Sequence, residues 1–153
     1  MEYLFRYNWA VRDEWFEWCR HIPHEELVKK RVGGAGSILF TLFHIIDVEY
    51  SWIRAVQNKP DIAPSFDRYG TLEKVKSLSD ELRPELHEFL KGWTGESDDE
   101  SVKASWSEDI HTAGEILRHV IAHEIHHVGQ LSIWAREIGK EPVSANFIGR
   151  GLM

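Results

Sequence analysis

The chain has 153 residues, of which 42% are apolar and 28% are charged. This composition is typical of a folded globular protein and excludes the disordered, collagen-like and low-complexity classes. The length favours a single domain over residues 1–153, because one core usually serves roughly 100 to 200 residues. The formal net charge of −7 would repel the negatively charged phosphate backbone of a nucleic acid, so we expect no nucleic-acid partner.

Nothing in the sequence indicates export or membrane insertion. No apolar run approaches the roughly 18 to 20 residues that cross a bilayer, and the first 15 residues contain neither a basic leader nor a cleavage site. We therefore expect no membrane association and a cytoplasmic location. Cys19 is the single cysteine, so any metal site would need histidine or carboxylate ligands.

Apolar residues recur at helical spacing in four stretches, and no stretch shows the alternation of a strand. The first predicted helix spans residues 2–20. The second spans residues 37–57, with Ser37 as its N-cap. Residues 58–70 contain two prolines and a glycine, so they predict a loop, which is a candidate lid over a site.

The third predicted helix spans residues 71–93, with Thr71 as its N-cap. Pro84 lies inside it, and we expect a kink or a local break because proline lacks the N–H and clashes with the preceding turn. Residues 94–109 are acidic and rich in serine. They predict an exposed crossover.

Thr112 and Glu115 form a capping-box motif that opens the fourth predicted helix, which ends near Ile138 before Gly139. Four amphipathic helices, with a long crossover before the last one, predict an all-α fold and a four-helix bundle. In such bundles, cofactor sites are built from side chains on facing helices.

Five of the nine histidines fall within 17 consecutive residues of the fourth helix and its approach. His119 and His127 lie about 40° to either side of His123 on a helix, so the three rings share one face. Histidines four residues apart can aim both rings at one metal ion. The pairs His119/His123 and His123/His127 both qualify by spacing.

His44, on the second helix, follows an apolar turn and precedes Asp47 by three residues. It is a candidate third ligand, and Asp47 could orient a ligand ring. A shared metal would satisfy imidazole nitrogens that would otherwise lie unpartnered. The alternative is that these histidines are surface residues or hydrogen-bonded core residues without a metal.

Three other metal sites are less consistent with the chain. Residues 123–127 match the His-Glu-x-x-His motif of zinc peptidases, but Gln130 and Ile133 replace the glycine and histidine that continue it in metzincins. A di-iron site needs Glu-x-x-His on two helices, and the second such pair, Glu108 and His111, lies at the end of the crossover. The charged neighbours disfavour haem.

Three segments resemble the DinB-like family, which is named for a DNA-damage-inducible member and is related to thiol-dependent transferases of bacilli and actinobacteria. The segments are YNWA at residues 7–10, HIIDVEYSW at residues 44–52, and His-x-x-x-His-x-x-His-His-x-Gly-Gln at residues 119–130. The third segment is the most specific, and the resemblance covers nearly the whole chain.

This resemblance implies a four-helix bundle, commonly a homodimer, that binds a divalent metal through His44, His123 and His127. It leaves His119 as a flanking residue. It also implies a small-molecule substrate, because several relatives join a low-molecular-weight thiol to an electrophile, or isomerise or hydrolyse a small molecule, while many have no assigned activity.

Three histidine ligands leave at least one position open, as in catalytic zinc sites, and that position could accept a thiol or a water. Zinc or nickel is expected, and iron and copper also suit imidazole. The candidate proton carriers are Asp47, Glu124 and His126, with Glu124 expected on a solvated helix face. The function expected is a transferase or hydrolase, and the alternative is a noncatalytic metal- or ligand-binding bundle.

The aromatic content adds an expectation about assembly. Seven tryptophans and many other aromatic residues exceed what one small core is expected to cover. We therefore also expect a homodimer on this ground.

Overall fold

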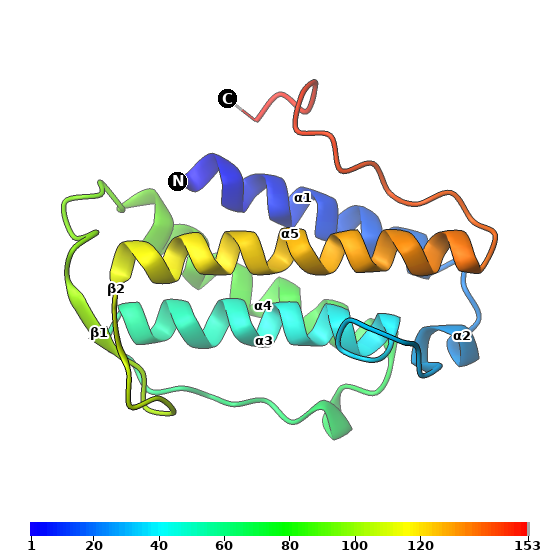
Figure 1. Ribbon diagram of the computed structural model, residues 1–153, viewed down its shortest axis with the longest axis horizontal. Coiled ribbons are helices and arrows are strands. Elements are labelled where there is room, and N and C mark those ends of the chain that lie inside the picture. Colours follow the sequence, from blue (N-terminus) through cyan, green and yellow to red (C-terminus); the bar gives the residue numbers. More distant parts are fainter. Residues whose placement is uncertain (153) are drawn as a thin grey trace.

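The computed structural model describes residues 1–152 and is mostly helical, as the sequence predicts (Figure 1). Its elements in chain order are α1 (Glu2–Cys19), α2 (His24–Val28), α3 (Ile38–Val56), the short 3₁₀ helix η1 (Phe66–Arg68), α4 (Leu72–Lys91), β1 (Ser101–Lys103), β2 (Ile110–Thr112) and α5 (Ala113–Glu137). Within these residues, no helix combines the length and apolar character that crossing a bilayer requires.

The four long helices pack against one another lengthwise. α3 and α5 lie side by side (Figure 1) and form the most extensive contact in the described chain. α1 packs against α5 and α4, and α4 also packs against α3. Each long helix therefore buries two sides, and α5 has one flank against α3 and another against α1.

The three predicted N-caps are confirmed. The hydroxyls of Ser37 and Thr71 each accept a hydrogen bond from the backbone N–H three residues later. Thr112 and Glu115 form the complete capping box at the start of α5. These caps satisfy backbone donors that the first helical turn leaves unpaired, and they fix where α3 and α5 begin.

Of the kink or local break expected at Pro84, the break does not occur, because α4 runs through this residue without interruption. Leu78, Leu86 and Leu90 on the same helix are buried against the other helices. Packing of an amphipathic face supplies most of the stability of a helix in a protein. This packing outweighs the hydrogen bond that the proline removes.

Three short features were not predicted, namely α2, η1 and an antiparallel hairpin. In the hairpin, Val102 of β1 pairs with His111 of β2, and Val102 is buried against Ala113 and Ile116 of α5. The crossover is therefore anchored to the helices rather than wholly exposed. Strands of three residues are too short to show a recognisable alternation in a sequence.

Candidate metal centre

Three histidines predicted as a cluster converge between α3 and α5. The Nε2 atom of His123 lies 3.1 Å from Nε2 of His44 and 3.1 Å from Nε2 of His127. One ring nitrogen from each residue lies within 4.8 Å of the others. Because a zinc-like ion binds imidazole nitrogens at about 2.0 to 2.1 Å, its neighbouring ligand nitrogens are roughly 3 to 3.5 Å apart. The observed spacing suits one shared metal ion.

Gln130 holds the ring of His127 in a defined orientation. Its Oε1 atom lies 2.7 Å from Nδ1 of His127, and its Nε2 atom lies 2.8 Å from Nε2 of His126. The amide oxygen accepts a hydrogen bond, so Nδ1 of His127 carries the proton and Nε2 presents its lone pair to the cluster. The same amide donates to His126, which is exposed and lies outside the three-histidine cluster.

The turn before α3 also supports the site. The sequence did not reveal this role of the turn. Gly34 has a φ of +56°, and a Cβ atom built there would lie 2.8 Å from Oε1 of Gln130 and 2.6 Å from Cη2 of Trp134. Both the backbone conformation and the close approach therefore require glycine. The run of glycines signals a turn, but contact with Gln130 depends on the tertiary structure.

The surroundings favour the neutral form of all three rings. Burial, followed by the proximity of the other rings, lowers the pKa of His123 to about 3. Burial is also the largest cause of the lowered pKa of His44 and His127. Neutral rings leave nitrogen lone pairs available, which is the form in which histidine binds metals.

These shifts predict a loss of stability in mild acid for the metal-free protein. The folded-state pKa values lie below the ordinary value of about 6.5, so the unfolded chain binds more protons below that pH. The free energy of unfolding should be greatest above about pH 6.5 and should fall as the pH drops toward 5. Urea unfolding with a chelator present measures this change. His123→Leu should reduce the pH dependence, and an identical slope in both proteins would contradict the prediction.

His119 and Asp47, both predicted near the metal, do not belong to the cluster. The exposed ring of His119 has its centroid 5.8 Å from that of His123 and 6.1 Å from that of Trp52. Asp47 makes no hydrogen bond to His44 among residues 1–152, and its Oδ1 atom is buried without a partner there. Burial and the neighbouring Asp61 raise the pKa of Asp47. The expected ring-orienting role therefore belongs to Gln130.

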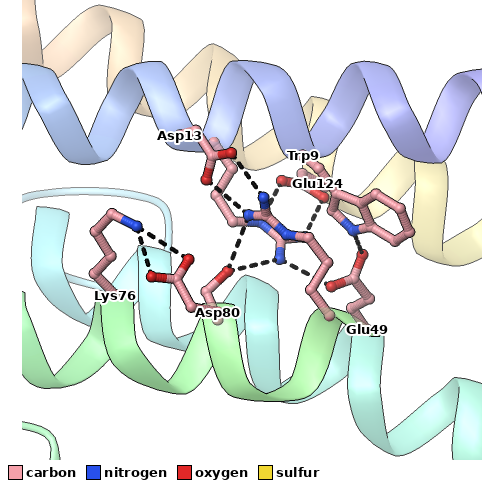
Figure 2. Close-up of polar contacts among 9 residues, drawn as sticks. Trp9, Asp13, Glu49, Lys76, Asp80 and Glu124 are labelled. Carbon is pink, nitrogen blue, oxygen red and sulfur yellow. Dashed lines mark hydrogen bonds and ion pairs between the residues drawn. The ribbon is translucent and has the colours of Figure 1, made fainter. Parts of the chain in front are cut away.

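The prediction for Glu124 is wrong. Its carboxylate is buried rather than solvated, and it receives hydrogen bonds of 2.8 and 2.6 Å from Nε and Nη2 of Arg12 (Figure 2). A residue next to His123 points about 100° away around the helix, and in α5 that direction faces α1. The flank of α5 that was expected to face water therefore faces the core, and Glu124 is not available as a proton carrier.

Two hollows lie about one helical turn from the three-histidine cluster, and none of its histidines lines either of them. The first, of about 250 Å³, is lined by Asp47, Ser51 and Asp61 together with Trp52 and Trp106. The second, of about 290 Å³, lies on the other side of Trp52 and is lined by residues of β2 and α5 that include His119. The loop over residues 58–70 borders the first hollow through Asp61, Ala63 and Pro64.

A mostly helical chain whose histidines converge from two facing helices matches the resemblance seen in the sequence. The chain belongs to the DinB family, whose model matches residues 1–150. It is also similar to the uncharacterized protein YizA of Bacillus subtilis (strain 168), with 57% identity over 150 residues. That match covers 97% of this chain and 94% of the relative.

Proposed function

We propose that the protein binds one divalent metal ion through His44, His123 and His127 and uses it to transfer a low-molecular-weight thiol to an electrophile, or to hydrolyse a small molecule. The fold proposed for this activity is a four-helix bundle of α1, α3, α4 and α5. The observation that carries the proposal is the convergence of three histidine rings, with Nε2 of His123 lying 3.1 Å from Nε2 of His44 and of His127. Hollows that could take a small substrate lie about one helical turn away, where Asp47 and His119 line them.

The residues present fit a metal of the class that imidazole ligands prefer, with zinc or nickel proposed first and iron or copper next. A divalent ion held by three histidines supplies a Lewis acid with at least one further ligand position. Gln130 keeps the Nδ1 proton on His127 and thereby orients its Nε2 atom. The low pKa of His123 keeps its ring in the neutral, ligating form.

Asp47 is the best placed of the predicted proton carriers. It lies one turn after His44 and lines the first hollow. Its raised pKa makes it a stronger base than an ordinary aspartate, as acid–base catalysis near neutral pH requires. His126 is less suitable, because its Nε2 atom is already engaged by Gln130.

The test combines metal analysis with an activity panel. Untagged protein is expected to contain about one zinc or nickel ion per chain. Loaded protein should conjugate thiols with electrophiles, or hydrolyse small esters and amides, and chelated protein should not. Absence of bound metal after loading would contradict the whole proposal. Bound metal without turnover in any assay would instead support the noncatalytic metal-binding alternative.

Two carboxylates in the same hollow provide a matched comparison. Asp47→Asn should lower kcat by about 100-fold, within the range of general-base effects, without changing the metal content. Asp61→Asn should lower kcat much less, and it should move the acid limb of the pH–rate profile to lower pH, because the Asp61 carboxylate helps to raise the pKa of Asp47. Equal kcat values for wild type and Asp47→Asn would exclude Asp47 as the base.

We also propose that the protein is a homodimer that pairs through the outer face of α5. Ala122, Ile125, Gly129 and Ile133 share this face at helical spacing and are exposed, with Ile133 58% accessible. A Cβ atom at Gly129 would meet nothing within 4 Å, so the protomer leaves space there. Exposed apolar stripes of this kind mark interaction surfaces.

Gly129→Arg should therefore convert the dimer to a monomer without unfolding the chain. Light scattering is expected to give the mass of two chains for wild type and of one chain for this variant. Ser77→Arg, an equivalent enlargement at an exposed position of α4, should leave the dimer intact. A wild-type mass of one chain at all micromolar concentrations would contradict the proposed assembly.

A further inference from the structure

A buried network of charged side chains links α1 to both histidine-bearing helices. Arg12 of α1 is 1% exposed. Its Nη1 atom donates to Oε2 of Glu49 at 2.8 Å, while Nε and Nη2 donate to the two oxygens of Glu124. The remaining oxygen of Glu49 accepts a hydrogen bond of 2.7 Å from the indole of Trp9. Figure 2 labels Trp9, Glu49 and Glu124 and draws these contacts as dashed lines.

Both carboxylates belong to the helices that carry the cluster. Glu49 lies on α3, five residues after His44, and Glu124 is the residue after His123 on α5. Each helix therefore presents a histidine on one side and a glutamate on another. The planar guanidinium binds both glutamates at once, so it fixes the rotation of α3 and of α5 about their own axes.

A small rotation of either helix about its axis displaces the ring nitrogens that would bind the metal. An imidazole Nε2 atom lies about 7 Å from the helix axis, so a helix rotation of about 10° moves it by about 1 Å. Metal–ligand distances tolerate only about 0.2 Å. The relative rotation of the two helices consequently decides whether three nitrogens can reach one ion.

Stability alone does not account for a charged network at this position. Apolar side chains of similar volume often stabilise a core as well as a buried ion pair does, or better. Directional hydrogen bonds supply something that apolar packing lacks, namely a defined orientation of the groups they join. In this chain the groups so joined are the two histidine-bearing helices.

We propose that Arg12 is a positioning residue for the metal centre, acting through Glu49 and Glu124 to hold the imidazole nitrogens in ligating geometry. This inference rests on the proposed metal site. A control exists in Arg150, which donates hydrogen bonds of 2.6 and 3.2 Å to the two carboxylate oxygens of Glu14. That pair joins the C-terminal segment to α1 rather than to either histidine-bearing helix.

The experiment measures the affinity for Zn²⁺ by competition titration and the visible spectrum of bound Co²⁺, which reports ligand geometry. Arg12→Met should weaken Zn²⁺ binding by about 10- to 100-fold, the range seen when groups that orient metal ligands are lost, and should change the Co²⁺ spectrum. The Zn²⁺ affinity of Arg12→Lys should lie between those of Arg12→Met and wild type, because lysine keeps the charge but loses the bidentate fork. Arg150→Met should leave both readouts unchanged.

A triple variant separates positioning from stability and also covers the case in which Arg12→Met does not fold. Arg12→Met combined with Glu49→Leu and Glu124→Leu removes the buried charges together. We expect it to unfold at a urea concentration near that of wild type, while Zn²⁺ affinity stays weak and the Co²⁺ spectrum stays altered. Recovery of wild-type affinity in this variant would overturn the proposal, as would wild-type affinity and spectrum in folded Arg12→Met.

The result for wild type distinguishes failure of the proposed metal function from failure of the positioning role of Arg12. If wild type binds neither Zn²⁺ nor Co²⁺, the proposed metal function is wrong and the role of Arg12 is overturned with it. If wild type binds both ions and Arg12→Met binds them equally well, the metal function stands and only the positioning role fails.

Discussion

Replacing His44, His123 or His127 with alanine should weaken metal binding by more than about 100-fold, whereas His119→Ala should weaken it by at most about 10- to 100-fold. Each of the first three changes removes one of three converging ring nitrogens. His119 only neighbours His123, with 5.8 Å between ring centroids. Loss of His119 should therefore weaken metal binding no more than loss of a group that orients a ligand, which typically lowers metal affinity by about 10- to 100-fold.

Competition titration with Zn²⁺ measures this contrast, and unfolding of each metal-free variant provides the control for folding. Loss of binding in His119→Ala together with normal binding in His127→Ala would show that the pair on α5 is displaced by one turn. Normal binding in His44→Ala would show that the site does not bridge to α3. Either result would contradict the proposed set of ligands.

Removing the metal should lower the melting temperature by roughly 10 °C. A ligand that binds only the folded state at 1,000 times its dissociation constant adds about 4 kcal/mol to the free energy of unfolding. Each kcal/mol shifts the midpoint by about 2 to 4 °C in a chain of roughly 150 residues. The physical reason is that the ion would connect α3 to α5, whose ligand residues are 79 positions apart for His44 and His123.

Calorimetry of loaded and chelated protein measures the shift, with elemental analysis confirming the metal content. His44→Ala should show little change on chelation, because its metal site is incomplete. A wild-type melting temperature that stays constant after confirmed metal loss would contradict the linkage between metal binding and folding.

The four long helices and their starting points could be predicted from local sequence. Ser37, Thr71 and Thr112 mark helix starts because a side-chain oxygen caps the first turn, and this interaction spans only three residues. The shared face of His119, His123 and His127 follows in the same way from helical periodicity. Three short features, α2, η1 and the hairpin, were missed because they are too short to produce a periodic pattern.

Local periodicity left open which histidine pair on α5 belongs to the cluster. The resemblance to the DinB family favoured His123 and His127, and the structure brings these two to His44 while His119 stays outside. The decisive quantity is the offset between α3 and α5 along their length, which depends on how two distant segments pack. Family similarity anticipated this result, whereas spacing within one helix could not.

Only the tertiary structure decided the environment of Glu124 and the partner of His127. Glu124 was expected in water because it lies about 100° from His123, but α1 packs on that flank of α5 and supplies Arg12. Gln130, rather than Asp47, holds the ring at the site. A sequence specifies the angle between side chains on one helix, whereas the neighbouring helices determine what each side chain meets at that angle.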